Sequence, residues 1–154
     1  MAKRTKKTYS GKYPVKNLKK YSGDPTNVIY RSLWERRVME YLDTSPFVKL
    51  WGSEEKVIPY KSTLDGRVHR YFMDFVALIE TPTGEHKKYL LEVKPHKETI
   101  LPVKPKRMSK SYTYAMETYL KNQDKWKAAS AYSKTYDYTF KIITEHELKH
   151  MNIF

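Results

Sequence analysis

Two carboxylates and a lysine interrupt a pair of strongly apolar segments near the middle of this 154-residue sequence. Asp74 lies within YFMDFV (71–76), and both Glu92 and Lys94 lie within LLEVK (90–94). A charged side chain inside an apolar strand is costly unless it is paired or binds something. We therefore expect these three side chains to form either a functional site or a buried ion pair.

The strand period predicts how the three groups meet. Side chains alternate along a strand, so Glu92 and Lys94 should share one face while Val93 faces the opposite layer. Two carboxylates with an ammonium nearby suit Mg²⁺, a hard ion that prefers carboxylates, water and phosphate oxygens, and Mn²⁺ is expected to substitute for it. Such a cation would activate water at a phosphodiester, while Lys94 orients the water or stabilises the negative charge. An Asp–Lys ion pair in a non-catalytic binding domain stays open as the alternative.

The tripeptide Glu-x-Lys is a weak signal by itself, because it occurs four times in the sequence. The other three begin at Glu54, Glu85 and Glu147. Only the tripeptide that begins at Glu92 lies in an apolar segment next to the segment that carries Asp74. Its context therefore selects it.

The surrounding pattern predicts the elements that position these groups. Ser32 is a typical N-cap for an amphipathic helix that ends near residue 43, and Thr144 with Glu147 forms a capping box for a short last helix. A long helix should start at Ser109 or Ser111 and end near residue 131. Strands are expected at 47–51, 56–60, 67–80, 87–94 and 137–143, with a hairpin turn at 81–84. The order helix, strands, helix, strand predicts an α/β fold, with a mixed central sheet flanked by helices.

Charge is concentrated at the N-terminus. The net charge is +13, and the first 23 residues carry eight lysines and arginines and no acidic residue. We predict a flexible basic tail over 1–26 and a single domain over 27–154. Such a tail suits a polyanionic partner, and Tyr9, Tyr13 and Tyr21 could stack on bases. A solvated tail that only aids solubility is the alternative.

Several classes of function are disfavoured by composition. The sequence has no cysteine, which excludes disulfides, thiolate zinc sites and cysteine nucleophiles. It has no apolar run of about 18 residues, so no membrane partner is expected and the protein should be soluble and intracellular. His146 and His150 fit the HExxH motif of zinc proteases, but only four residues follow to supply the third ligand. A capped surface helix is the better interpretation.

Met73-Asp74 followed by Glu92-Val93-Lys94 resembles the signature of the PD-(D/E)XK nucleases, with Met73 in place of the usual Pro. The resemblance implies a restriction-endonuclease-like core of helix, three strands, helix and strand over 31–143. It also implies a Mg²⁺-dependent endonuclease acting on double-stranded DNA.

A closer resemblance lies in the blocks NVIYRSLWERRVM (27–39), SEEKVIPY (53–60), HRYFMDF (69–75), LLEVKPHKET (90–99) and LKNQDKWKAA (120–129). Together they resemble the head-completion nucleases of T-even-type tailed phages. The resemblance implies processing of the packaged DNA end, contact with portal, neck or other head proteins, and a place in the host cytoplasm or as a minor virion component. Two rivals remain: a non-catalytic head or neck protein that binds DNA, and a related nuclease for branched or invading DNA.

The resemblance also implies further site residues. Glu35 in the first helix is expected to complete the metal site or orient a ligand, and Gln123 on the long helix is expected to face the same site. We expect DNA contacts from Arg36 and Arg37, which directly follow Glu35. The loop after Lys94 also carries cations suited to phosphates, at Lys97, Lys104, Lys106, Arg107 and Lys110. An exposed linker is the alternative for this loop.

Overall fold

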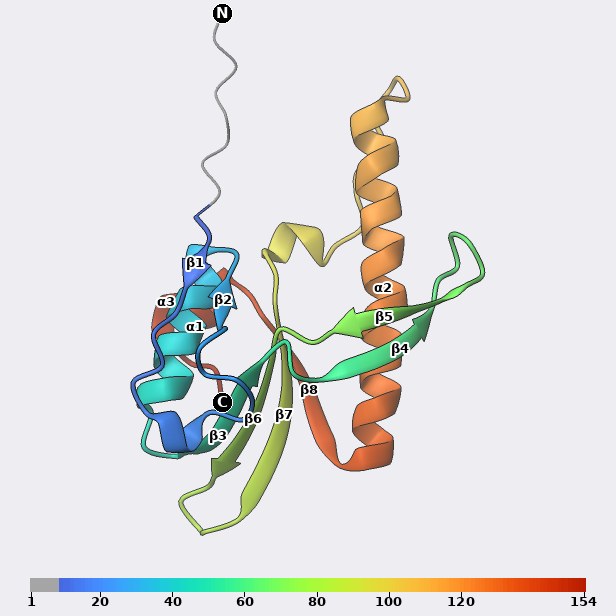
Figure 1. The fold of residues 1–154 in the computed structure, drawn as a ribbon. Coiled ribbons are helices and arrows are strands. Elements are labelled where there is room, and N and C mark those ends of the chain that lie inside the picture. Colours follow the sequence, from blue (N-terminus) through green and yellow to red (C-terminus); the bar gives the residue numbers. More distant parts are fainter. Residues whose placement is uncertain (1–8) are drawn as a thin grey trace, which may run out of the picture.

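The computed structural model describes residues 9–154, which form a mixed sheet with helices on both sides (Figure 1). The strand order is β3-β6-β7-β8. These strands are β3 (Val48–Ser53), β6 (Phe75–Glu80), β7 (His86–Val93) and β8 (Tyr138–Ile143). The first three are antiparallel and β8 runs parallel to β7. The predicted α/β class with a mixed central sheet is confirmed.

Three helices follow the predicted capping signals. Ser32 and Ser109 each accept a backbone N–H three residues on, and Thr144 with Glu147 completes a capping box. The helices are α1 (Leu33–Thr44), α2 (Lys110–Tyr136) and α3 (Glu145–His150), with short 3₁₀ turns η1 (Leu18–Lys20) and η2 (His96–Glu98). Two antiparallel strand pairs complete the fold: β1 (Gly11–Lys12) with β2 (Ile29–Tyr30), and the hairpin of β4 (Val57–Lys61) with β5 (Val68–Phe72).

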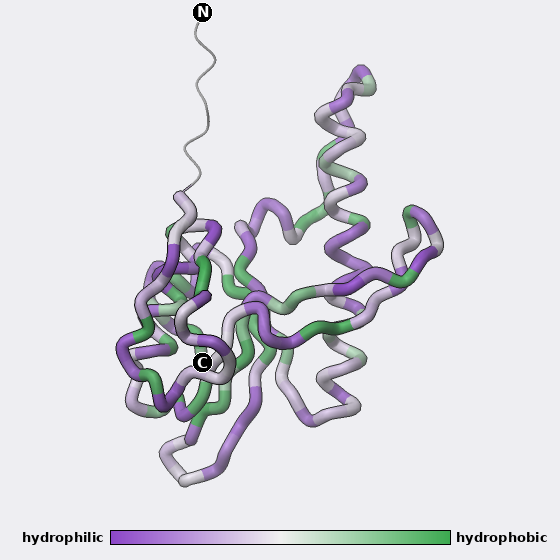
Figure 2. The backbone as a smooth tube through the Cα atoms, viewed as in Figure 1, coloured by the Kyte–Doolittle hydropathy of each residue, from purple (hydrophilic) through white to green (hydrophobic). Residues whose placement is uncertain are grey.

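The sheet separates two hydrophobic cores. On the α1 side the core includes Leu42, Trp51 and Leu91, whereas the core on the α2 side includes Leu90 and Trp126. Consecutive residues of β7 therefore belong to opposite faces, as the strand period requires. Figure 2 shows the hydrophobic residues gathered along the central strands. Continued along β7, the alternation puts position 92 on the α2 side.

The segment 67–80 was predicted to be one strand, and that prediction is wrong. It breaks at Met73-Asp74 into β5, which pairs with β4, and β6, which pairs with β3 and β7. The segment between β3 and β4 turns at the same level. There Glu54 has a positive φ of 56°, and its N–H donates to the carbonyl of Asp74 at 3.2 Å. The hairpin β4–β5 is thereby turned out of the sheet toward α2 (Figure 1).

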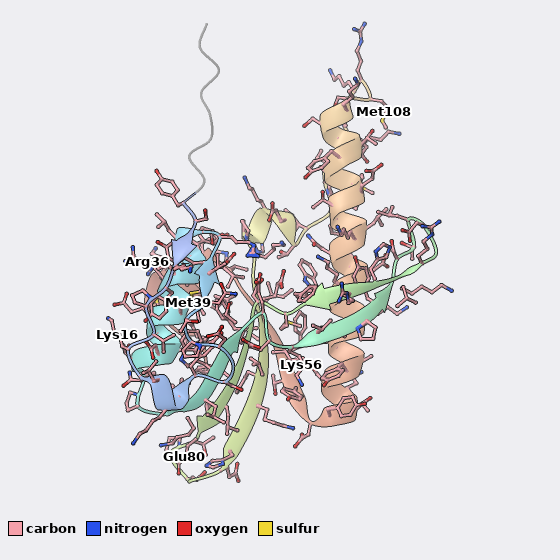
Figure 3. All side chains as sticks on the ribbon, viewed as in Figure 1. Lys16, Arg36, Met39, Lys56, Glu80 and Met108 are labelled. Carbon is pink, nitrogen blue, oxygen red and sulfur yellow. The ribbon has the colours of Figure 1, made fainter. Side chains whose placement is uncertain are left out.

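Residues 9–26 do not form the free tail that the charge pattern predicted. Tyr13 and Tyr21 are buried, and both rings pack edge-on against Trp51. Asp43, which is fully buried, accepts bonds from the Tyr13 hydroxyl at 2.9 Å and from the N–H of Lys16 at 2.8 Å. Figure 3 shows Lys16 beside α1. The two tyrosines are core residues rather than base-stacking groups, and the remaining part of the predicted tail, 1–8, lies outside the described residues.

Helix α2 is only half packed. Its buried residues, Asn122, Trp126, Ala129 and Ser133, lie at its middle and in its second half. The first half projects beyond the rest of the fold (Figure 1), Tyr114 there is 72% exposed, and Met108 lies at its tip (Figure 3). Among the described residues, no helix is long and apolar enough to cross a membrane.

Candidate active site

Asp74 and Glu92 meet where the sheet gives way to the β4–β5 hairpin. The register pairs Phe75 with Leu91, and its continuation by one residue places Asp74 opposite Glu92. The Asp74 carboxylate accepts the N–H of Val93 at 2.8 Å, which ties it to the β7 backbone. The Glu92 side chain is buried, at 4% exposure. Two carboxylates from neighbouring strands therefore share one partly enclosed position, as the sequence predicted.

Lys94 completes the predicted constellation. It directly follows β7, and its backbone N–H bonds to the carbonyl of Ile143 at 2.9 Å, which continues the parallel pairing with β8. Its ammonium lies 3.6 Å from Oε1 of Glu92. The prediction that Glu92 and Lys94 share a face is confirmed, and Val93 packs in the opposite core.

Tyr71 is a site residue that sequence reasoning missed. Its hydroxyl donates to Oε2 of Glu92 at 2.5 Å, and its ring is buried in the core on the α2 side. Burial, together with the nearby Glu92 charge, raises the pKa of Tyr71 far above its usual value, so the phenol stays protonated and can donate. The signal for this role in the sequence was the position of Tyr71, which lies in β5, three residues before Asp74.

The carboxylates of the site repel one another. Burial raises the pKa of Asp74 well above its ordinary value; the charge of Glu92 adds to this, and the bond from Val93 opposes it. Glu35 and Lys94 also act on Asp74, with opposite signs. A carboxylate pair held in this way gains from any cation that enters between them. Such strongly perturbed acids are typical of functional sites.

Glu35 lies within electrostatic reach but does not join the pair as a third ligand. Its carboxylate accepts the backbone N–H of Arg31 at 2.9 Å, and burial, more than any charge, raises its pKa. Within the described residues, no three His, Asp or Glu side chains are grouped closely enough to hold a metal ion together. One oxygen of Glu35 is thus held by the backbone just before α1, and its part in a metal site stays a prediction.

The two arginines next to Glu35 have protein contacts. Arg37 donates to the carbonyl of Leu148 at 2.9 Å and so fastens the end of α3, and the guanidinium of Arg36 lies over the ring of Tyr30, 5.6 Å from its centroid. Arg37 thus has a structural role that the sequence did not suggest. Figure 3 places Arg36 on the α1 side of the molecule.

The remaining predicted DNA contacts lie on α2 and on the loop before it. The loop cations are all exposed and run from η2 to the projecting tip of α2: Lys97, Lys104, Lys106, Arg107 and Lys110. Gln123 is half-buried on α2. A helix turns 100° per residue, so Gln123 and Lys125 lie on nearly opposite flanks. The flank of Lys125 faces the carboxylates, since its ammonium lies 5.2 Å from the ring centroid of Tyr71.

Comparison with known proteins agrees with this geometry. The family model described as "TnsA-like endonuclease N terminal" matches residues 45–145, which span the sheet, the carboxylate pair and α2. The chain is also 41% identical over 145 residues to a protein of Enterobacteria phage T4 named "Head completion nuclease", covering 92% of this chain and 94% of that protein. No solved structure matches. The chain therefore belongs to the TnsA-like endonuclease family, which has a restriction-endonuclease-like fold.

Proposed function

We propose that this protein is a divalent-cation-dependent DNA endonuclease that processes packaged DNA during phage head completion. The main observation in support of a cleavage site is the Asp74–Glu92 carboxylate pair with Lys94 beside it. The name of the phage T4 relative supports the biological step. We place its action in the infected host cytoplasm or on the maturing head, next to portal or neck proteins.

The residues present fit a hard divalent cation. Mg²⁺ keeps several water ligands and needs only one or two carboxylates together with phosphate oxygens. Asp74 and Glu92 supply two such carboxylates, and their mutual repulsion is what a cation would relieve. Mn²⁺ has the same oxygen preference and is expected to substitute.

Each side chain of the site has a distinct task. Asp74 and Glu92 would hold the cation, which would supply Lewis-acid polarisation of the phosphate and a lowered pKa of bound water. Tyr71 holds one oxygen of Glu92, which leaves Oε1 directed toward Lys94. Lys94 orients the attacking water or stabilises negative charge that develops on the phosphate. Glu35, whose charge acts on Asp74, is expected to complete the metal site or to orient one of its ligands.

DNA is expected to reach this site along basic surface. The loop cations between η2 and the tip of α2 are exposed and close to the end of β7 in the chain, so they can follow a phosphate backbone. Contacts of this kind hold DNA without reading its sequence. We therefore expect double-stranded DNA to bind with strong salt dependence.

Cleavage of plasmid DNA in Mg²⁺ or Mn²⁺ tests the proposal. Wild-type protein should nick or cut, while Asp74→Asn and Lys94→Ala should lose at least about 100-fold in rate. Glu85→Gln and Lys87→Ala are matched controls, since this Glu-x-Lys lies exposed at the turn of the same hairpin. The controls should cut like wild type.

Three outcomes would contradict the proposal. Absence of cleavage by the wild type would favour a non-catalytic head or neck protein that keeps the fold as a DNA-binding scaffold. Undiminished cleavage by both site variants would show that other residues catalyse the reaction. A strong preference for branched over linear DNA would favour the related nuclease that acts on junctions.

A further inference from the structure

Lys125 on α2 places its ammonium group over the ring of Tyr71, the residue that supports Glu92. Its ammonium lies 5.2 Å from the ring centroid of Tyr71, and the hydroxyl of Tyr71 donates to Glu92. Lys94 approaches the same carboxylate from the end of β7. Two lysines from different elements therefore flank the pair from different directions.

The surroundings of Lys125 leave its charge unmatched. The side chain is half-buried, and within residues 9–154 it makes no ion pair with a carboxylate inside 4 Å, whereas Lys94 does. Burial lowers the pKa of Lys125; Glu92 and Asp74 oppose this, while Lys121 and Lys94 add to it. A partly desolvated ammonium without an anion is costly, and a cation–π contact offsets only part of that cost.

A phosphate oxygen would supply the missing anion. If the proposed function holds, a DNA phosphate must lie beside the Asp74–Glu92 pair, and Lys125 faces that pair from the α2 side. We propose that Lys125 is a substrate contact, whose ammonium binds a non-bridging oxygen of a DNA phosphate next to the carboxylate pair. Lys94 and Lys125 would then hold the DNA backbone from two sides.

The proposed substrate contact on α2 is Lys125 and not Gln123, the residue expected from the sequence resemblance. The sequence resemblance pointed to Gln123, but the helical period puts Gln123 on the opposite flank of α2 from Lys125. Asp124, between them, accepts the N–H and hydroxyl of Thr63 in the β4–β5 hairpin at 2.8 and 2.9 Å. These bonds fix the rotation of α2 that brings Lys125 to the site.

The test uses Lys125→Gln and Lys125→Arg, with Lys127→Gln as the control because Lys127 is exposed on the same helix. DNA binding is measured against salt in an Asp74→Asn background that should not cleave. Lys125→Gln should lower the slope of log affinity against log salt by about 0.9, the value for one lost phosphate contact. Lys125→Arg should restore the slope, and Lys127→Gln should leave it unchanged.

Cleavage by the same Lys125 variants, with Asp74 intact, completes the test. Lys125→Gln should lose about 100-fold in kcat/KM, and Lys125→Arg should recover most of it. If the glutamine variant does not fold, Lys125→Met, which keeps the apolar stem, replaces it. A salt slope equal to that of Lys127→Gln overturns the inference whether or not cleavage falls, because Lys125 then acts only through Tyr71.

The DNA-binding measurements test this inference separately from the proposed function. An unchanged salt slope with cleavage still dependent on Asp74 would overturn the Lys125 assignment alone. Cleavage that survives Asp74→Asn would overturn the proposed site, whatever the slope shows.

Discussion

Two aspartates of this protein have opposite surroundings, Asp43 being fully buried and Asp74 partly buried. Asp43, at the end of α1, accepts hydrogen bonds from the Tyr13 hydroxyl and from the N–H groups of Lys16 and Asn17. Asp74 accepts one backbone N–H and otherwise faces Glu92, whose charge works against its own. The donors around Asp43 all come from the N-terminal segment.

The difference separates structure from function. A buried charge whose hydrogen bonds are complete holds chain segments together, and removing it leaves donors unsatisfied. A buried charge beside a like charge weakens the fold, so a protein that keeps it gains something other than stability. By this criterion we assign a structural role to Asp43 and propose a functional role for Asp74.

The largest effect on stability is expected from Asp43→Asn. An amide cannot accept from all three donors as the carboxylate does, so the free energy of unfolding should fall by about 3 kcal/mol. Chemical denaturation measures this. Cleavage per folded molecule should be unchanged, and a selective loss of activity would show that Asp43 serves the site after all.

Removal of residues 2–8 should affect binding and leave the fold intact. This segment carries Lys3, Arg4, Lys6 and Lys7 and precedes the anchoring bonds to Asp43. We expect the salt slope to drop by about 3 to 4 and the loss of DNA affinity to grow as salt is lowered. Titration of labelled DNA at several salt concentrations measures both. Unchanged affinity would assign the segment to another partner.

Asp74→Asn should stabilise the protein in the absence of divalent cations. The raised pKa of Asp74 means that its ionised form opposes folding at neutral pH, so a neutral amide should gain about 1 kcal/mol. The gain should shrink as pH falls through the raised pKa, because the wild-type carboxyl then takes up its proton. Thermal melts in chelator check this, and Mg²⁺ should raise Tm only for the wild type. A destabilised variant in chelator would contradict the comparison.

The smallest effects should come from a matched pair of tyrosine variants. Tyr13→Phe removes one donor to Asp43 and should cost about 1 kcal/mol of stability without changing cleavage. Tyr71→Phe removes the donor to Glu92 and should lower kcat severalfold more than it raises KM, since Glu92 loses its orientation. Equal effects of both variants on kcat would remove the distinction between the two carboxylates.

The local pattern of the sequence determined most elements and half of the site. Caps at Ser32, Ser109 and Thr144 predicted where helices begin, since capping involves residues only a few positions apart. The strand period likewise predicted that Glu92 and Lys94 share a face, and the ion pair between them confirms it. The resemblance of the motif blocks added the order of the core and the endonuclease family, both of which stand.

Tertiary structure decided everything that depends on distant partners. The break of the predicted strand at Asp74 requires β3 and β4 to turn at the same level, and the burial of Tyr13 requires Asp43, 30 residues away. Which flank of α2 faces the site depends on how Asp124 bonds to Thr63, 61 residues earlier. Periodicity describes a single element and carries no record of which element it will pack against, so these partners follow only from the assembled fold.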